Sequence, residues 1–269
     1  MDVGRTEERA VRRLRDWYAH PRYYEAIFGV DTEREMGFVL ELSRRYGTGG
    51  EVLLEPACGA GRLIEEGARR GLRMVGYDAS EVMLAHARRR LRRSGLQARV
   101  ELGRMEFWAP TDLRGRVDAA YSLVSTFRYL DSEAAAVAHL SSVRKLLRPG
   151  GLYVLGFHLT DYARTGMLHE RWVGRAGRDQ VVCNTREWPP DRRARSARMR
   201  NRLRVQGPGK DWIIETEWRF RTYDEPEAQA VFRAAGLRVL QVFNFEYQVD
   251  RPIPWTSNRL DRVMVLGAG

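Results

Sequence analysis

The sequence predicts an α/β fold: a doubly wound, mostly parallel seven-stranded sheet with an N-terminal helical cap and an antiparallel β insertion after the fifth strand. From residue 51 onward, strand-like and helix-like runs alternate, which indicates parallel strands joined by right-handed crossovers. The first apolar run enters a turn containing Gly59 and Gly61 that opens a helix. Residues 178–222 instead alternate with a period of two, which is typical of antiparallel strands.

The amino-terminal segment is expected to be helical between residues 5 and 46. Val11, Leu14 and Tyr18 recur at helical spacing, a break falls at residues 20–21, and a second helical run covers 27–46. The expected core strands lie near 51–55, 73–78, 98–102, 117–123 and 151–158, and the expected helices near 60–70, 80–93 and 132–147. After the insertion come a helix near 225–235 and strands near 238–247 and 261–266. The expected domains are a helical cap (1–48), a Rossmann-like core (49–160 and 223–269) and an antiparallel insertion (161–222).

The insertion is expected to contain a strand pair around the turn 206–211. Apolar residues 199, 203 and 205 alternate with arginines at 198, 200, 202 and 204, and the return strand presents one face made of Trp212, Ile214, Thr216, Trp218 and Phe220. Glu215 and Glu217 fall on the other face, so cross-strand ion pairing explains the basic run better than an anion-binding surface does. Trp188, Trp212 and Trp218 are expected to pack against the sheet, with a lid or a subunit contact as the alternative.

Composition limits the class of protein. The 269 residues can bury one substantial core, so one α/β domain with an insertion is expected. A net charge of +11 raises the question of a nucleic-acid partner, but only Lys145 and Lys210 among the 46 basic residues are lysine. Codon bias in a GC-rich genome explains that ratio at least as well as a binding surface does, and we expect no nucleic-acid partner.

Cysteines and the amino terminus indicate where the protein works. Cys58 and Cys183 are the only cysteines, and they indicate neither a disulfide framework nor a metal site. Residues 1–14 are charged and contain no apolar core segment, so no signal peptide is expected. No apolar run approaches membrane-spanning length. We therefore expect a cytoplasmic protein with no metal and no membrane partner.

The glycine turn and Asp78 together indicate a nucleotide-binding corner. A residue without Cβ lets the backbone turn sharply and approach a ligand closely. Asp78 closes the next apolar run, about 20 residues after the turn, the spacing at which a carboxylate meets ribose hydroxyls. Capping of the following helix is the alternative role for Asp78, although Ser80 serves that purpose equally well.

One class of protein with such a nucleotide-binding corner is the dinucleotide dehydrogenases, which also join a glycine turn to a ribose-binding acid. Its fingerprint has a third glycine three residues after the second, where this chain has Ile64. The turn from Arg148 to Gly151 and the late antiparallel strands also fit that class poorly.

Together, these residues resemble the class I S-adenosylmethionine-dependent methyltransferases of small-molecule type. Three separated segments carry the resemblance: the glycine turn 55–62, the segment 76–87, and the turn 146–152 that in such enzymes leads into the fifth strand. The three segments together are far more specific than any one of them. The resemblance covers most of residues 50–160 plus the carboxy-terminal strand pair. It implies S-adenosyl-L-methionine as the cofactor and S-adenosyl-L-homocysteine as the product.

The resemblance also implies the residues at the cofactor. Glu55 would face its amino group, Gly59 and Gly61 would underlie it, and Asp78 would bind the ribose. Met105 would contact the adenine, with ordinary core packing as the alternative. The other residues implied at the cofactor are Tyr24, Ala57, Arg62, Ala79, Met83, Ser122 and Leu123. Arg104 stands where similar enzymes often have aspartate, and Glu106 is the candidate to replace that acid at the adenine amino group.

Methyl transfer from a sulfonium needs a lone pair aligned behind the methyl carbon, so the protein mainly supplies orientation and a dry pocket. His158 is the candidate base, because it falls at the carboxyl end of the fifth strand, where ligands of open α/β sheets gather. A hydrogen-bonded structural histidine is the alternative. The residues expected around the acceptor are Tyr23, Phe127, Arg128, Tyr129 and His158, with anchoring of helices to the sheet as the alternative for the cap tyrosines.

The fourth predicted strand ends in residues 122–125, Ser-Leu-Val-Ser, rather than in the Asn/Asp-Pro-Pro-aromatic tetrad of adenine methylases. The resemblance therefore implies in-line methylation of a nitrogen or oxygen of a small-molecule acceptor, such as an amine, amino acid or sugar-like metabolite. The alternatives are an RNA or protein methyltransferase and a non-catalytic nucleic-acid or partner-binding module on the same fold. A homodimer is left open.

Overall fold

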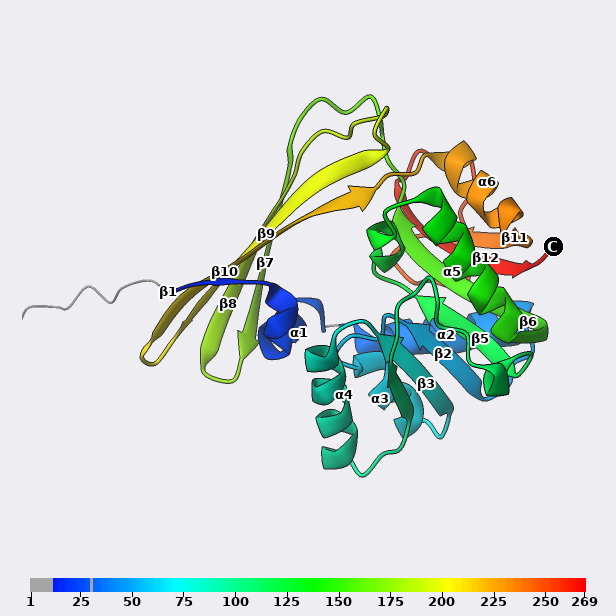
Figure 1. Cartoon of the computed structure of the whole chain (residues 1–269), viewed down its shortest axis with the longest axis horizontal. Coiled ribbons are helices and arrows are strands. Elements are labelled where there is room, and N and C mark those ends of the chain that lie inside the picture. Colours follow the sequence, from blue (N-terminus) through cyan, green and yellow to red (C-terminus); the bar gives the residue numbers. More distant parts are fainter. Residues whose placement is uncertain (1–11, 30) are drawn as a thin grey trace, which may run out of the picture.

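The computed structural model describes residues 12–29 and 31–269. Two β-sheets organise these residues, one of seven strands and one of five. Figure 1 shows the seven-stranded sheet wrapped by helices in one lobe, while the long strands of the five-stranded sheet extend away from it as a second lobe.

The seven-stranded sheet has the order β11-β12-β6-β5-β2-β3-β4. Its strands are β2 (Val52–Pro56), β3 (Arg73–Asp78), β4 (Arg99–Leu102), β5 (Val117–Ser122), β6 (Leu147–His158), β11 (Leu237–Phe243) and β12 (Asp261–Ala268). The pairs among β2 to β6 are parallel, and β12 runs antiparallel to both β6 and β11. The predicted doubly wound sheet is confirmed, and its order reverses between β2 and β5, where open α/β sheets bind their ligands.

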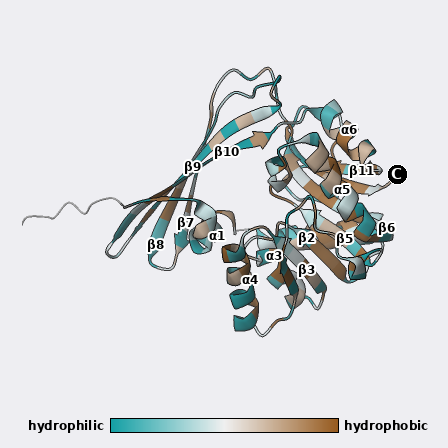
Figure 2. Cartoon of the chain, viewed as in Figure 1, coloured by the Kyte–Doolittle hydropathy of each residue, from teal (hydrophilic) through white to brown (hydrophobic). Residues whose placement is uncertain are grey.

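Helices cover both faces of this sheet. The buried sides of α2 (Thr32–Tyr46), α3 (Arg62–Arg69) and α4 (Glu81–Arg93) belong to one apolar cluster, and those of α5 (Glu133–Leu146) and α6 (Glu225–Ala234) to another. Figure 2 shows the hydrophobic residues concentrated in the strands between these helices. Ser80 and Ser132 cap α4 and α5 by accepting backbone N–H bonds, and a capping box opens α6.

The insertion contains four long strands rather than two: β7 (Leu168–Ala176), β8 (Asp179–Glu187), β9 (Ser196–Gly207) and β10 (Lys210–Arg221). The predicted strand pair is β9 and β10, and an ion pair of 3.4 Å joins Arg202 to Glu215 across it. A second ion pair, of 3.0 Å, joins Arg198 to Glu217. The prediction missed β7 because most residues of this edge strand are exposed, so the strand lacks a clear alternation.

The amino-terminal segment corrects the prediction of a helix through Leu14 and Tyr18. Residues 12–15 form β1 (Arg12–Arg15), which pairs in parallel with β10, and η1 (Trp17–Ala19) and α1 (Pro21–Phe28) follow. Leu14 lies opposite Ile214 and packs on the apolar cluster of the five-stranded sheet, so pairing with an existing strand decides its conformation. Val11 and the expected helix before it lie outside the described residues.

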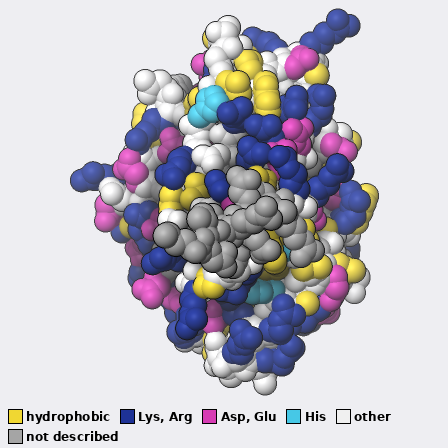
Figure 3. Space-filling model, turned by 90° about the vertical axis from the view of Figure 1, so that its left-hand side faces the viewer, with side chains coloured by type: hydrophobic (Ala, Val, Ile, Leu, Met, Phe, Trp, Pro, Cys, Tyr) yellow, Lys and Arg dark blue, Asp and Glu magenta, His cyan; other side chains and the backbone are white. Residues whose placement is uncertain are grey.

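The five-stranded sheet, in the order β1-β10-β9-β8-β7, has faces of different polarity. Its buried face is mostly apolar and includes Val181, Cys183, Leu203, Val205 and Ile214. Figure 3 views the molecule from the end that carries this sheet and shows basic side chains spread widely, with acidic ones among them. Among the described residues, no helix is long and apolar enough to cross a membrane.

Candidate active site

The glycine turn after β2 is held by Asp78 at the end of β3. Its Oδ2 accepts a hydrogen bond from the backbone N–H of Gly59 (2.9 Å), and its Oδ1 accepts one from that of Ser80 (2.8 Å). Gly59 and Gly61 have φ angles of 53° and 74°, which residues with a Cβ rarely adopt. A Cβ on Gly61 would also lie 2.7 Å from the Cβ of Ala87. Asp78 therefore fixes the turn, and Ser80 is the residue that caps α4.

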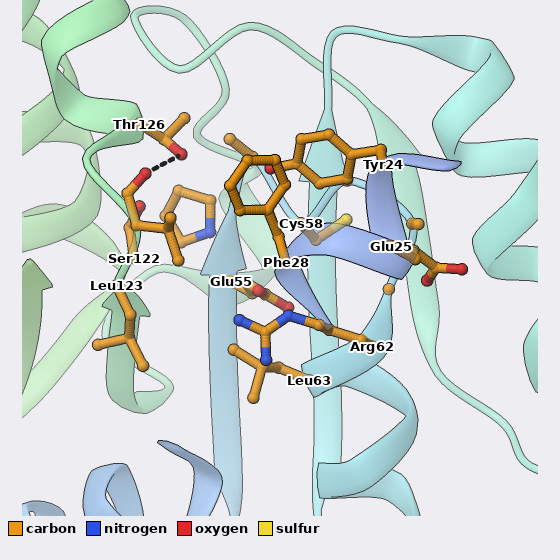
Figure 4. A pocket seen from close by; sticks show the side chains of 16 residues that line it. Tyr24, Glu25, Phe28, Glu55, Cys58, Arg62, Leu63, Ser122, Leu123 and Thr126 are labelled. Atoms are coloured by element: carbon orange, nitrogen blue, oxygen red, sulfur yellow. Dashed lines mark hydrogen bonds between the residues drawn. The ribbon is translucent and has the colours of Figure 1, made fainter. Parts of the chain in front are cut away.

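A cavity lies between this turn, α1 and the end of β5. Many of the residues implied at the cofactor line it: Tyr24, Glu55, Ala57, Gly59, Gly61, Arg62, Ser122 and Leu123. Figure 4 shows the rings of Tyr24 and Phe28 on one side of the cavity, with Glu55 and Arg62 close together on the other. The turn thus meets α1 across an opening at the switch point of the sheet.

Glu55 is the buried carboxylate of this cavity. Its Oε2 accepts a hydrogen bond from Tyr121 Oη (3.3 Å), while the neighbouring Arg62 is ion-paired with Glu35. Burial raises the pKa of Glu55 to about 8, although the positive charge of Arg62 opposes the shift. A cation bound beside Glu55 would favour the ionised carboxylate, so the cavity fits a ligand that carries an ammonium group.

A second cavity, of about 400 Å³, adjoins the first. Four residues line both cavities, which are therefore immediate neighbours: Tyr24, Phe28, Val124 and Thr126. Most of the other lining residues come from η1, from η3 (Thr126–Tyr129), from the end of β6 and the segment after it, and from β7 to β10. The five-stranded sheet therefore closes the space above the carboxyl edge of the seven-stranded sheet.

Aromatic side chains from several elements meet in this second cavity. Trp17 lies at their centre, with its ring centroid 4.7–5.8 Å from those of Tyr18, Tyr24, Phe28 and Trp218. Tyr18 Oη donates a hydrogen bond to Tyr129 Oη (2.8 Å), and burial raises the pKa of both phenols. A neutral aromatic wall of this kind attracts a cation, such as a sulfonium or an alkylated ammonium.

His158 lies at the end of β6, and its ring lines the second cavity. Its Nδ1 is 3.0 Å from the Oγ of Ser125, and its ring packs edge-on against Phe245 at a centroid distance of 4.8 Å. Desolvation at the cavity wall and the nearby Arg128 guanidinium lower the pKa of His158 to about 4. The imidazole is therefore neutral near pH 7 and is a weak base.

Arg128 and Arg164 reach the same cavity and share one carboxylate. Arg164 Nη2 lies 2.8 Å from Glu187 Oε1, and Arg128 Nη2 lies 3.9 Å from that oxygen. The Arg128 guanidinium also stacks over Phe220 at 4.9 Å, and burial lowers its pKa. These contacts hold both guanidinium groups in place. Arg128 is therefore a fixed lining residue of the cavity and not a mobile cation.

Two residues expected around the acceptor line neither cavity. Tyr23 Oη donates a hydrogen bond to Asp179 (3.0 Å) and accepts one from Lys210 (2.8 Å). Phe127 is fully buried in the core, with its ring centroid 5.3 Å from that of Phe157. Both side chains anchor structural elements, which is the alternative that the sequence left open for the cap tyrosines.

The remaining residues implied at the cofactor lie around the ends of β3 and β4, outside both cavities: Asp78, Ala79, Met83, Met105 and Glu106. The Met105 side chain is buried in the core, and its carbonyl oxygen is 3.2 Å from His139 Nδ1. Burial would raise the pKa of Glu106, but hydrogen bonds from its own backbone and from Arg104 outweigh burial and lower it. Glu106 is therefore an ionised acceptor at this edge.

Sequence reasoning missed two groups of residues at this edge and in the cavity. Leu102 is 59% exposed and lies opposite Asp78 in register, and Phe107 is 76% exposed nearby in sequence. Their signal was weak, because isolated apolar residues after a short strand are common on protein surfaces. The second group is the aromatic wall, whose Trp17 and Trp218 are about 200 residues apart in the sequence and meet only through the pairing of β1 with β10.

Comparisons with known proteins agree with this geometry. A family model described as a methyltransferase domain matches residues 53–151. The chain is 28% identical over 227 residues to dTDP-3-amino-3,4,6-trideoxy-alpha-D-glucopyranose N,N-dimethyltransferase of Streptomyces venezuelae, a match that covers 82% of this chain and 90% of the relative.

Solved structures share the fold. An S-adenosylmethionine-dependent methyltransferase from Clostridium acetobutylicum is 16% identical, with a TM-score of 0.74 over 91% of this chain and 96% of its own. The sugar N-methyltransferase KedS8 from Streptoalloteichus is 20% identical, with a TM-score of 0.69 over 98% of each chain.

The glycine turn with its aspartate, the doubly wound sheet and the matched domain define one class: the chain is a class I S-adenosylmethionine-dependent methyltransferase. Within that class, it is related to sugar N-methyltransferases that act on small molecules. The dehydrogenase alternative is thereby excluded.

Proposed function

We propose that the protein transfers a methyl group from S-adenosylmethionine to the amino group of an amino sugar or a similar small molecule. The observation that carries the proposal is a pair of neighbouring cavities that share four lining residues: one at the glycine turn, and a second of about 400 Å³ lined by aromatic rings. The relative whose name specifies a dTDP-linked amino sugar supports this acceptor class, as does the sugar N-methyltransferase with the same fold.

S-adenosylmethionine supplies an electrophilic methyl group on a sulfonium. We propose that Gly59 and Gly61 let the backbone lie against it and that Glu55 binds its ammonium group. Each oxygen of Asp78 accepts one backbone hydrogen bond, which leaves a second lone pair on each oxygen for a ribose hydroxyl. The carboxylate can therefore fix the turn and bind the ribose at the same time.

At the adenine end, we propose that apolar side chains provide contact area and that one acid provides the hydrogen bond. Leu102 and Phe107 are exposed beside Asp78 and would cover the faces of a flat ring. Glu106 is only 3.1 Å from Arg104, yet an ionised carboxylate has lone pairs left for the adenine amino group. This arrangement would replace the acid that similar enzymes have at position 104.

We place the acceptor in the second cavity, with its nitrogen directed toward the residues that the two cavities share. From there a lone pair can approach the methyl carbon in line, and the protein contributes orientation and exclusion of water. The rings of Tyr24 and Phe28 lie at this junction, where positive charge passes from sulfur to nitrogen. The aromatic rings would thus stabilise the positive charge both on the sulfonium before transfer and on the nitrogen after transfer.

We propose that His158 forms a hydrogen bond with the acceptor amine rather than removing its proton. A neutral imidazole can accept a hydrogen bond from the amine N–H and so turn the nitrogen lone pair toward the methyl group. General-base catalysis, the expectation from the sequence, works best with a pKa near the working pH, well above the value of about 4 at His158. The surplus proton of an ammonium product can leave to solvent.

We also propose a revised domain division. β1 pairs with β10, and α1 packs against β7 and β8, so residues 12–28 associate with the insertion 161–222 more closely than with a separate cap. Together they would form the acceptor-binding unit, and residues 49–160 and 223–269 would form the cofactor-binding unit.

A methyl-transfer assay tests the proposal. The protein is incubated with S-adenosylmethionine carrying a deuterated methyl group and, separately, with methyl 3-amino-3-deoxy-α-D-glucopyranoside, with the corresponding 3-hydroxy glucoside, and with total RNA. We expect the label on the amine alone, detected by mass spectrometry. Label on the hydroxy sugar would indicate an O-methyltransferase, and label only on RNA would contradict a small-molecule acceptor.

A further inference from the structure

A row of polar side chains crosses the inner face of the five-stranded sheet. In register, Glu170 of β7 lies opposite Thr185 of β8, Thr185 opposite Asn201 of β9, and Asn201 opposite Thr216 of β10. Residues opposite one another on neighbouring strands project to the same face of a sheet. The first three members of this polar row line the second cavity, so the row faces the space that we assign to the acceptor.

The rows on either side of the polar row are mostly apolar. One contains Leu168, Glu187, Met199 and Trp218, and the other contains Trp172, Cys183, Leu203 and Ile214. Asn201 is 3% exposed and Thr185 is 4% exposed. Burying polar groups among apolar side chains costs free energy unless each group finds a hydrogen-bond partner. The hydrogen-bond partners of these polar side chains therefore indicate whether the row serves the fold or a ligand.

Part of the row is satisfied within the protein. Thr185 Oγ1 donates a hydrogen bond to Asn201 Oδ1 (2.8 Å), and Thr216 Oγ1 accepts one from the backbone N–H of Trp17 (3.0 Å). In the first of these bonds the amide oxygen is engaged, which leaves the Nδ2 end as the free donor. The second bond holds η1, with its aromatic residues, against the sheet.

Two groups of the row make no hydrogen bond or ion pair with any described residue: Asn201 Nδ2 and the carboxylate of Glu170, a residue on the exposed edge strand. One is a donor, and the other is an acceptor that stands near Glu187. Partial desolvation at the cavity wall and the negative charge of Glu187 raise the pKa of Glu170, as expected for a carboxylate without a cationic partner. A ligand in the cavity can satisfy both groups.

We propose that Glu170 and Asn201 determine acceptor specificity by binding the polar edge of a sugar ring, with Asn201 Nδ2 donating to a ring or hydroxyl oxygen and Glu170 accepting from a hydroxyl group. The backbones of the two residues are two strand spacings apart, on the order of 10 Å, so their side chains can converge on one six-membered ring. Trp218, in the adjoining row, provides a flat apolar surface for the ring face. This inference rests on the proposed function.

The row predicts discrimination between an amino sugar and an amine that lacks ring oxygens. A site built to hydrogen-bond a substrate rejects an analogue that leaves its buried polar groups unpaired. A nucleotide-linked amino sugar and a simple amino glycoside share the ring chemistry that the row would bind, so the test includes both. The probes are methyl 3-amino-3-deoxy-α-D-glucopyranoside, its dTDP-linked 3-amino-3-deoxyglucose counterpart, and cyclohexylamine.

The experiment measures binding of each probe to protein saturated with S-adenosylhomocysteine, by calorimetry, for wild type, Glu170→Gln and Asn201→Asp. Asn201→Asp keeps the oxygen that Thr185 bonds and removes the donor. We expect each substitution to weaken binding of the amino sugars at least about tenfold and to leave cyclohexylamine and S-adenosylhomocysteine unchanged. Glu215→Gln, on the opposite face of the same sheet, is the matched control and should have no effect.

The outcomes separate this inference from the proposed function. Unchanged amino-sugar binding in both variants, or no amino-sugar binding by the wild type, overturns the role of the row. If the substitutions weaken amino-sugar binding but the wild type transfers no methyl group to the sugar, then the role of the row in binding is supported and the proposed N-methylation is overturned. A similar loss for both sugars supports the row, and tighter binding of the dTDP-linked sugar than of the simple glycoside by the wild type identifies the nucleotide-linked form as the acceptor. Glu170 lies on an exposed edge strand, so Glu170→Gln tests the row even if Asn201→Asp reduces folding.

Discussion

Glu55 connects the stability of the fold to the electrostatics of the cofactor cavity. Burial raises its pKa from 4.5 to about 8, so within that pH window the folded protein binds more protons at this site than the unfolded chain does. Stability is therefore expected to fall as the pH rises through the window. In Glu55→Gln this contribution disappears, and the wild type should lose roughly 1.4 kcal/mol per pH unit relative to the variant.

Urea unfolding of the protein without cofactor, measured at several pH values for both forms, checks this expectation. Glu217→Gln, an exposed carboxylate in the insertion, is the control for removing a negative charge. Parallel pH dependences for wild type and Glu55→Gln would show that Glu55 is ionised throughout.

His158 gives a second test at the scale of a residue. Its pKa of about 4 means that its charge does not change between pH 5.5 and 8. We expect His158→Asn to lower kcat by roughly ten- to a hundredfold through loss of orientation, without moving the pH profile of kcat/KM. An inflection near the ordinary histidine pKa in the wild type, absent from the variant, would assign general-base catalysis to His158 instead.

At this scale, spacing alone could predict the glycine turn and Asp78, because their chemistry depends on backbone conformation near a strand end. Spacing could not distinguish Tyr23 from Tyr24, which are adjacent on α1. Tyr24 lines both cavities, whereas Tyr23 bonds Asp179 of the insertion. Successive helical residues point about 100° apart, and only the packing of α1 on its neighbours decides which one faces the ligand.

Among the elements, α1 has the most direct influence on the site, because it carries Tyr24 and Phe28 and packs closely on β7. A Cβ on Gly174 of β7 would lie 1.7 Å from the carbonyl oxygen of Ala26. We expect Gly174→Ala to displace α1, lower the melting temperature and weaken both cofactor and acceptor binding. Gly166→Ala, where a Cβ meets nothing within 4 Å, is the control.

Calorimetric titration of both glycine variants with S-adenosylhomocysteine, together with thermal melts, provides the measurement. If Gly174→Ala binds the ligand as the wild type does and melts at the same temperature, then α1 is not held by its contact with β7.

The core strands were predictable because burial on both faces produces continuous apolar runs between glycine turns. The strands β7 and β1 could not be predicted, each for a different reason. β7 is an exposed edge strand whose pattern reflects neither a buried nor a half-buried sheet. β1 has four residues, and its partner β10 lies about 200 residues further along the chain, so no local signal specifies the pairing.

For the molecule as a whole, the two sheets divide the work. The seven-stranded sheet supplies the turn and the acid that we assign to the cofactor, and the five-stranded sheet supplies most of the wall around the acceptor. We therefore expect Asp78→Ala to abolish S-adenosylmethionine binding, and Trp218→Ala to raise the KM for the acceptor at least about tenfold while cofactor affinity stays constant.

Binding by calorimetry and steady-state kinetics on the two variants test this division. Asp112→Ala, an exposed aspartate in η2 (Thr111–Leu113), is a control for the first change. Equal loss of cofactor affinity in Trp218→Ala would mean that the sheets do not act as separate binding units.

The cofactor class and a small-molecule acceptor could be predicted from the sequence, whereas the identity of the acceptor could not. The cofactor motif occupies short continuous segments whose residues act through the backbone. The acceptor cavity joins Trp17 near the amino terminus to Phe245 near the carboxyl terminus, with β7, β8, β9 and β10 between them. Its composition emerges only when two sheets and a helix have packed.

The most direct test of the account is a crystal structure of the protein with S-adenosylhomocysteine and methyl 3-amino-3-deoxy-α-D-glucopyranoside. We predict that the amino nitrogen lies at the junction lined by Tyr24 and Phe28, facing the sulfur along the line of transfer, with His158 within hydrogen-bonding distance. The sugar ring should rest against Trp218. An amino sugar bound outside the space between the two sheets, or bound there with its nitrogen directed away from the sulfur, would contradict the proposed N-methyltransferase site.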